Sequence, residues 1–356
     1  MADEALNYPL LLEARLVPRL WGGDALRDFH RLARVVEGSR KAGVAGPDTA
    51  TAEPIGESWV AGEDNVVTNG PLTGRSLREL ATRYGAALLG TANTERYGDK
   101  LALLAKFLDA KQVLSVQVHP DDAYALEHER ETGHLGKAEA WYVLTTEPGA
   151  YVLWGFARDV TAEEVRQAVR RGDLESLMNR LPVTAGDVIV NPAGLVHAVG
   201  PGVMLFEIQQ SSDLTYRLYD FDRRGPDGRP RELHVEKALD VAYLGRSDES
   251  SMRGRVAAGP GERDSWRRLV ELPEFVLDAA DLGSGDAHGE LRDATSEASL
   301  ELLVVTRGRA TVCGQGPDDC VDMERGDAVL LPAALGGYIV RGSGEVLRCA
   351  VTKRSP

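Results

Sequence analysis

The stretch GDVIVNPAGLVH, residues 186–197, carries the clearest structural signal in the chain. The Gly-Asp pair that opens it is typical of a tight turn, and the run VIVN after it is typical of a short strand. Pro192 and Gly194 shape a second turn, and His197 is expected to point inward from the strand that follows. The stretch therefore predicts a β-sheet protein that buries a histidine.

A second copy of this pattern lies near the C-terminus, as GDAVLLPAALGG at residues 326–337. The segments upstream also match, because WYVLTTEPGAYV resembles LLVVTRGRATV once one turn residue is dropped. The chain is therefore expected to contain two copies of one β-unit. In this alignment Leu300 stands opposite Glu139, and Gly337 stands opposite His197. The second copy therefore lacks these two residues, whose types bind metals in proteins, and is expected to be structural and free of metal.

Length and composition fit an ordinary globular protein of one large or two smaller domains. The 356 residues are 43% hydrophobic and 27% charged, and no run of about 18 apolar residues suggests a membrane span. The N-terminus MADEALNYPLLLEARL is acidic where a signal peptide is basic, so a cytoplasmic location is expected. A net charge of −14 argues against nucleic acid and anionic membranes as partners. Nothing in the sequence indicates an oligomeric state.

The three cysteines, Cys313, Cys320 and Cys349, all lie in the last part of the chain. They show no C-x-x-C spacing, so neither a disulfide framework nor a thiolate zinc site is indicated. We expect reduced thiols.

A polar stripe marks the stretch LSVQVHPDDAYALEHERETGHLGKAEAWYVL, residues 114–144. Strand alternation places Ser115, Gln117 and His119 on one face, and a charged excursion separates them from Glu139. We expect the excursion to be a loop at the rim of the same cavity. Together Gln117, His119, Glu139 and His197 offer two nitrogens and two oxygens, a set suited to one Zn²⁺ per chain or to another divalent ion.

The expected domain layout is mainly β. Residues 1–245 are expected to form the metal-binding catalytic domain, with a helical hairpin at about 161–181 broken at Gly172. A linker is expected at 246–259, followed by a second β-domain at 260–356.

The pattern G-D-x4-P-x-G-x2-H is the second signature of the cupin β-barrels, and further motifs narrow the resemblance. IGESW, SVQVHPDD, GKAEAWYVL and EIQQSSDLTYRLYDFDR together resemble the type I phosphomannose isomerases of the short bacterial kind, over about residues 8–245. The resemblance implies two cupin-type (jelly-roll) β-barrels and the four metal ligands named above. The departures are mild: Leu195-Val196 replaces a common Thr-Ile, and Asn191 replaces an apolar residue.

The resemblance also implies a reaction, the interconversion of mannose 6-phosphate and fructose 6-phosphate through an enediol. In that family Arg217 and Lys137 would be catalytic and would bind the sugar phosphate, and Ser115 would line the substrate pocket. The general base stays open among a second-shell carboxylate, a histidine and a metal-bound water. Additional candidates for phosphate contact are Arg223, Arg224 and Lys106.

Two alternatives remain at this stage. An isomerase of unphosphorylated aldoses would use the same metal site, because that site acts on C1 and C2 of the sugar. A non-catalytic sugar-sensing cupin would keep the ligands without turnover. A cupin dioxygenase is disfavoured because Gln117 breaks the histidine-rich ligand set of such enzymes.

Overall fold

The computed structural model describes residues 6–31, 53–225, 228–248, 265–284, 288–316 and 319–352. It is mainly β, as expected, and it divides into two compact units that interleave along the chain. Unit 1 comprises residues 1–17, 24–107 and 258–356, and unit 2 comprises residues 18–23 and 108–257. The functional division at 1–245 and 260–356 stays a prediction, because compactness does not reveal which residues act together, and most of the expected linker lies outside the described residues.

Unit 2 contains two groups of paired strands. One sheet has the order β12-β5-β10-β7-β8, and the strands β11, β6 and β9 pair in that order. A core of apolar side chains from both groups includes Trp141, Val152, Ile189 and Leu205. The bounds of the strands are β5 Val116–Val118, β6 Glu139–Thr146, β7 Tyr151–Phe156, β8 Met178–Pro182, β9 Val188–Asn191, β10 His197–Val199, β11 Val203–Gln210 and β12 Tyr216–Tyr219.

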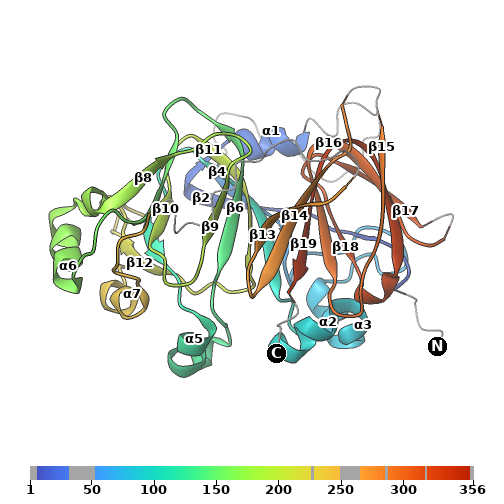
Figure 1. The fold of residues 1–356 in the computed structure, drawn as a ribbon, viewed down its shortest axis with the longest axis horizontal. Coiled ribbons are helices and arrows are strands. Elements are labelled where there is room, and N and C mark those ends of the chain that lie inside the picture. The colour runs from blue at the N-terminus through green and yellow to red at the C-terminus, as the bar shows by residue number, and fades with distance from the viewer. Residues whose placement is uncertain are drawn as a thin grey trace. The chain divides into compact units, whose positions relative to one another are not determined.

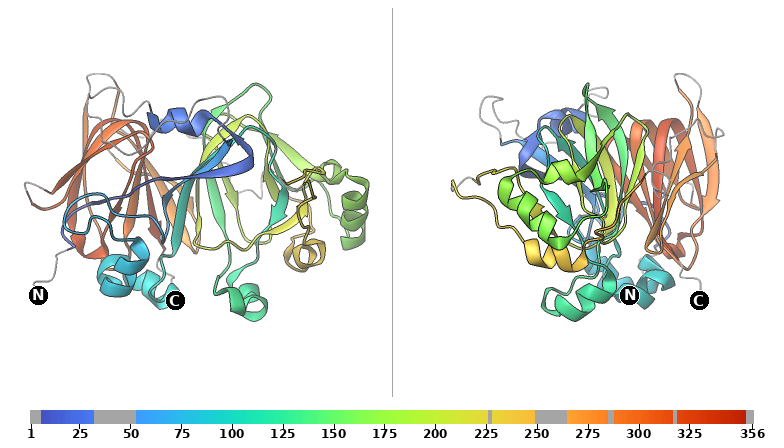
Figure 2. Two further views of the ribbon diagram at one scale, coloured as in Figure 1. Left: turned by 180° about the vertical axis from the view of Figure 1, so that it is seen from behind. Right: turned by 60° about the vertical axis from the view of Figure 1, so that its left-hand side comes forward.

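Helices lie outside these sheets in unit 2 (Figures 1 and 2). They are α5 Asp122–His128, α6 Ala162–Arg171 and α7 Val235–Val241, with two short 3-10 segments at Arg130–Thr132 and Leu174–Leu177. A second apolar cluster joins α6 and α7 to the five-stranded sheet through residues such as Val165, Ala238 and Phe156. The helices therefore cover the sheet face that looks away from the inner core.

The predicted hairpin at 161–181 is helical only in its first half. Thr161 caps α6 by accepting from the Glu164 backbone N–H, and the Glu164 carboxylate accepts from the Thr161 N–H. Gly172 ends α6 in the left-handed region at φ 74°. The chain then makes a 3-10 turn and enters strand β8, because Met178 and Leu181 are buried by pairing with β7.

Unit 1 is built around one eight-stranded sheet of order β1-β18-β16-β19-β14-β13, with β17 added on β16 and β15 on β19. A cluster that includes Leu303, Val329, Tyr338 and Val346 forms its core. The strands are β1 Leu10–Leu11, β13 Arg267–Glu271, β14 Phe275–Asp281, β15 Gly289–Ala294, β16 Glu301–Cys313, β17 Cys320–Glu324, β18 Ala328–Leu331 and β19 Gly337–Val351.

The remaining elements of unit 1 come from the N-terminal third of the chain. They are α1 Ala25–Arg31, β3 Ile55–Ala61, α2 Leu77–Tyr84, α3 Ala86–Leu89 and α4 Thr91–Tyr97, and β2 Arg15–Gly23 and β4 Leu103–Ala110 have residues in both units. Among the described helices, none is both long and apolar enough to cross a membrane.

The internal repeat is confirmed at the level of hydrogen bonds. Gly186 and Gly326 have φ of 90° and 93°, a region that glycine adopts without strain. The N–H of Gly186 donates to Val143 and that of Gly326 to Val305, over 2.8 Å in each case. The strand pairings of the described residues form open sheets and no closed barrel. The expected pair of jelly-roll barrels therefore stays a prediction.

One residue of the repeat alignment was wrong. In unit 2 Glu139 pairs with Asn191, and in unit 1 Glu301 pairs with Leu331, which is the counterpart of Asn191. Glu301 and not Leu300 is therefore the counterpart of Glu139. The dropped turn residue shifted the sequence alignment by one position, which is enough to exchange the two faces of a strand.

The expectation of reduced cysteines is also wrong for two of the three. Cys313 and Cys320 form a disulfide, while Cys349 is free and buried. The pair sits directly opposite on β16 and β17. The spacing alone does not reveal this hairpin, so the contact between the two residues could not be predicted from the sequence.

Candidate metal centre

A row of side chains crosses the five-stranded sheet of unit 2. Gln117 of β5 lies directly opposite His197 of β10 on one side and Arg217 of β12 on the other. His197 lies opposite Trp154 of β7 in turn. Because directly paired residues share a sheet face, all four side chains start from the same face.

A second row crosses the other group of strands. Glu139 of β6 lies directly opposite Asn191 of β9 and opposite Gln209 of β11. All three residues are 0% exposed. A carboxylate flanked by two carboxamides is thus buried inside unit 2.

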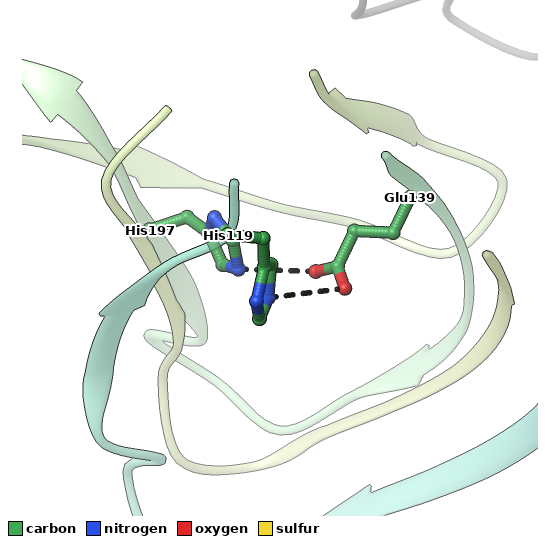
Figure 3. Close-up of side chains that lie close together, drawn as sticks. All are labelled: His119, Glu139 and His197. Atoms are coloured by element: carbon green, nitrogen blue, oxygen red, sulfur yellow. Dashed lines mark ion pairs between the residues drawn. The ribbon is translucent and has the colours of Figure 1, made fainter. Parts of the chain in front are cut away.

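Three side chains from these elements converge. Glu139 Oε1 lies 3.1 Å from His197 Nε2, and Glu139 Oε2 lies 3.4 Å from His119 Nε2. Figure 3 shows both imidazole rings turned toward the two oxygens of the one carboxylate. One ligand atom from each residue lies within 4.8 Å of the others, in a group that is fully buried.

Contacts with backbone carbonyl groups determine which nitrogen of each histidine ring is the hydrogen-bond donor. His119 Nδ1 lies 2.8 Å from the Leu214 carbonyl oxygen, and His197 Nδ1 lies 2.8 Å from the Leu195 carbonyl oxygen. A carbonyl only accepts, so each Nδ1 is the donor, and in a neutral ring Nε2 keeps a lone pair. Metal-bound histidines commonly make this second contact, which orients the ring.

The consequence is a set of acceptors that face one another. Where His197 Nε2 carries no proton, this atom and Glu139 Oε1 are both acceptors, and neither has a hydrogen-bond partner among the described residues. Two buried acceptors 3.1 Å apart repel unless a proton or a metal cation lies between them. The residues present therefore fit a divalent metal.

Lys137 supplies a positive charge at the other side of the carboxylate. Its Nζ lies 2.9 Å from His119 Nε2 and 2.5 Å from Glu139 Oε2. Burial, followed by the ammonium of Lys137, lowers the pKa of His119 to about 3, so this ring is neutral. Burial raises the pKa of Glu139, but the ammonium of Lys137 opposes it and the pKa lies well below the ordinary value, so Glu139 is a carboxylate.

The other predicted residues lie around this cluster with different degrees of burial. Gln117 is half-buried and faces His197, and Ser115 is 5% exposed just before β5. Arg217 is half-buried, with Nη1 3.0 Å from the Glu232 carbonyl oxygen. Its Nε is buried and has no hydrogen-bond partner in the part of the chain that the structure describes. Burial and then Arg231 lower the pKa of Arg217.

The segment between β5 and β6, residues 119–138, was expected to be a rim loop. It contains a helix and is held by several side-chain contacts. The helix is α5, and Glu129 accepts from the Tyr216 hydroxyl over 2.8 Å and from Lys237 Nζ over 2.6 Å. Gln210 Oε1 accepts from the Ala138 N–H, and its Nε2 donates to Asp122, both over 2.9 Å. These contacts hold the backbone beside Lys137 in place.

The additional phosphate candidates differ in burial and in their partners. The side chain of Arg223 is 11% exposed and donates to the Val113 carbonyl oxygen. Arg224 is exposed and bonds the Gly228 carbonyl oxygen over 2.8 Å. Lys106 lies buried in strand β4, in the part that belongs to unit 1.

Sequence reasoning missed three residues beside the cluster. Asn191 was noted only as a mild departure, and Gln209 and Glu207 were not considered. Glu207 is 3% exposed, with Oε1 3.9 Å from Lys137 Nζ. Each sits on a strand otherwise rich in apolar residues, and a polar residue within a buried strand was the available signal.

Fold and cluster together define a mainly β protein with a buried His-Glu-His site suited to a divalent metal. The model of the "phosphomannose isomerase type I, catalytic domain" family matches residues 27–145. The chain is 41% identical to mannose-6-phosphate isomerase of Streptococcus mutans, over 95% of this chain and 97% of that protein. It is 34% identical to mannose-6-phosphate isomerase ManA of Bacillus subtilis, over 95% and 98%. The chain belongs to the type I phosphomannose isomerase family.

Solved structures agree with this family. A crystal structure of the mannose 6-phosphate isomerase from Bacillus subtilis matches with a TM-score of 0.71 and 28% identity, over 96% of this chain and 99% of that one. A putative mannosephosphate isomerase from Archaeoglobus fulgidus matches with a TM-score of 0.73 at 22% identity, over 99% of this chain and 100% of that one, which shows the same fold.

Proposed function

We propose that this protein interconverts mannose 6-phosphate and fructose 6-phosphate with the help of one bound zinc ion. The family and its named relatives support the reaction. The observation that supports the metal is the pair of buried acceptors, His197 Nε2 and Glu139 Oε1, that face each other at 3.1 Å.

Gln117, His119, Glu139 and His197 would hold the ion. Two imidazole nitrogens and two oxygens suit zinc, although another divalent ion would accept the same set. Bound zinc would supply a Lewis acid that polarises the substrate oxygens at C1 and C2. The backbone contacts of the two rings would keep Nε2 of each histidine directed at the ion.

Lys137 and Arg217 would stabilise the negative charge of the enediol-type intermediate. Proton transfer between C2 and C1 places charge on O1 and O2, and fixed cations in a site without bulk water stabilise such charge strongly. Lys137 is 4% exposed and already lies against the cluster. Arg217 starts from the same sheet face as His197, and its Nε lacks a hydrogen-bond partner among the described residues.

The phosphate group needs donors that are separate from the metal. Ser115 precedes Gln117 by one alternation of the strand, so its hydroxyl starts from the same face. We propose that Ser115 is such a donor to the phosphate group, while Lys137 and Arg217 bind the same sugar phosphate at O1 and O2.

The two copies of the β-unit also support a pair of cupin-type halves. Matching glycine turns and matching register in β6–β9 and β16–β18 favour this reading. We propose that only the copy in unit 2 holds metal, because Gly337 stands where the first copy has His197.

A coupled assay of mannose 6-phosphate turnover with metal analysis of the same sample tests the proposal. We expect turnover, about one zinc per chain, and loss of turnover on treatment with a chelator that added zinc reverses. Free mannose is assayed in parallel. Equal turnover of mannose would identify an isomerase of unphosphorylated aldoses, and sugar binding without turnover would identify a sensor.

His197→Ala should lose bound zinc and lower turnover at least about 100-fold, because a ligand and its fixed geometry are removed. His128→Ala is the matched control, since His128 is an exposed histidine of α5. Full activity and full zinc content in the His197→Ala protein would contradict the assignment.

A further inference from the structure

Asn191 is a buried polar residue with no visible function in the folded chain. Its side chain is 0% exposed, and neither Oδ1 nor Nδ2 has a hydrogen-bond partner among the described residues. Buried carboxamides are nearly always hydrogen-bonded, because an unpaired donor or acceptor in the interior is destabilising. A partner absent from the chain itself is therefore required.

The strand register directs Asn191 at the candidate metal centre. Asn191 of β9 lies directly opposite Glu139 of β6, so the two side chains share a face. Trp141, two residues along β6 on that face, also has a buried Nε1 without a hydrogen-bond partner among the described residues. Gln209 of β11, opposite Glu139 on its other side, likewise has an Oε1 without a hydrogen-bond partner among the described residues. Unpaired donors and acceptors thus lie on both strands that flank Glu139.

The second copy of the β-unit provides an internal comparison. Leu331 of β18 is the counterpart of Asn191, and it lies opposite Glu301 in the same register. Leu331 is 0% exposed. The fold therefore accepts a branched apolar side chain of similar size at this position, so folding alone does not require an asparagine.

We propose that the carboxamide of Asn191 is a substrate-binding group that holds a hydroxyl of the sugar beside Glu139. This inference rests on the proposed function. A carboxamide presents one acceptor and two donor hydrogens, and a sugar hydroxyl both donates and accepts. A phosphate dianion only accepts and would leave Oδ1 unpaired, so the position suits the hydroxyl-bearing part of the substrate.

The variant Asn191→Leu tests this, because it reproduces the residue of the other copy. We expect an unchanged zinc content, a higher Tm without substrate, and a KM for mannose 6-phosphate raised roughly 5- to 50-fold, with kcat changed less than about 3-fold. Leu331→Asn is the matched control. It should lower the Tm, because it buries an unpaired carboxamide, and leave KM unchanged.

Two results would overturn the inference while the wild type remains active. An unchanged KM in Asn191→Leu would mean that a water molecule alone satisfies the carboxamide. Loss of zinc in Asn191→Leu would mean that Asn191 orients Glu139 and does not bind substrate.

A failure of the proposed function gives a different pattern. If the wild type does not convert mannose 6-phosphate, the shift of Tm on adding mannose, fructose or their 6-phosphates still measures sugar binding. A shift in the wild type that Asn191→Leu loses supports the inference. Equal shifts in both proteins, or no shift in the wild type, overturn it.

Discussion

At the residue scale, the sequence indicates which side chains could bind a metal more readily than it indicates the hydrogen bonds around those side chains. Strand alternation predicted that His119 shares a face with Gln117, and the second turn of residues 186–197 predicted that His197 points inward. The structure brings both histidines to Glu139. The contacts that fix each ring come from Leu214 and Leu195 carbonyls, which no residue pattern encodes. Asn191 was passed over for the same reason, because its side chain stands out only by having no hydrogen-bond partner among the described residues.

The variant Lys137→Met removes the positive charge of Lys137 and leaves the four proposed metal ligands in place. We expect kcat for mannose 6-phosphate to fall about 100-fold or more, because the ammonium lies at the place where negative charge would develop. Zinc content should stay at the wild-type value, since the four proposed ligands are intact.

Lys111→Met is the control for this variant. Lys111 forms a 2.9 Å ion pair with Glu147 in which both side chains are more than 60% exposed, so its loss should change kcat less than twofold. A Lys137→Met enzyme with wild-type kcat would exclude Lys137 from charge stabilisation.

At the scale of elements, local signals located the helix α6 but not its successor. A Thr cap and Gly172 define the bounds of α6, whereas β8 forms because pairing with β7 outweighs the helical periodicity of its sequence. The segment between β5 and β6 was misjudged similarly. Its charges suggested a solvated loop, yet Glu129 is 9% exposed and holds the segment against β12 and α7.

Glu129 gives this segment a pH-dependent stability. The hydrogen bond from Lys237 lowers the pKa of Glu129, against the opposing effect of burial, and the Tyr216 hydroxyl lowers it further. A carboxyl group with a pKa lowered on folding stabilises the fold above its unfolded pKa, about 4.3, and loses this contribution as the pH falls through the folded pKa.

Glu129→Gln should therefore be less stable than the wild type at pH 7, by about 1–2 kcal/mol, and the difference should shrink on acidification below about pH 4. Denaturant unfolding of both proteins at pH 7 and below about pH 4 measures this difference in stability. Hydrogen exchange of residues 122–135 shows whether the loss is in this segment. Glu131→Gln is the matched control, because Glu131 is exposed on the same segment. A pH-independent difference would exclude the ionised Glu129 as its source.

At the scale of the whole molecule, the two copies of the β-unit use one position in different ways. Glu139 faces two histidines, whereas its counterpart Glu301 accepts from the Tyr338 hydroxyl over 2.6 Å and lies 3.8 Å from Arg348. Arg348 also contacts Asp278 over 2.8 Å and Asp293 over 2.5 Å. The repeat could be recognised in the sequence. The network around Arg348 could not, because the residues that form it come from four separate strands.

The arginine therefore supplies, in unit 1, the positive charge that a metal ion would supply in unit 2. Its side chain is 15% exposed, and those of Asp278 and Glu301 are 2% and 11% exposed. Arg348→Met should lower the free energy of unfolding by about 3–5 kcal/mol, because removal of one partner leaves buried carboxylates without their counter-charge. Zinc content and KM should not change, since all proposed ligands belong to unit 2.

Arg341→Met is the control for that loss. Arg341 is also on β19, but its pair with Glu290 at 2.6 Å is half exposed and should contribute no more than about 1 kcal/mol. The double variant Arg348→Met with Glu301→Leu should regain part of the stability, because it removes one of the uncompensated carboxylates together with the cation. If Arg348→Met unfolds at the same denaturant concentration as Arg341→Met, the network does not stabilise unit 1, and the second copy must rely on its apolar core alone.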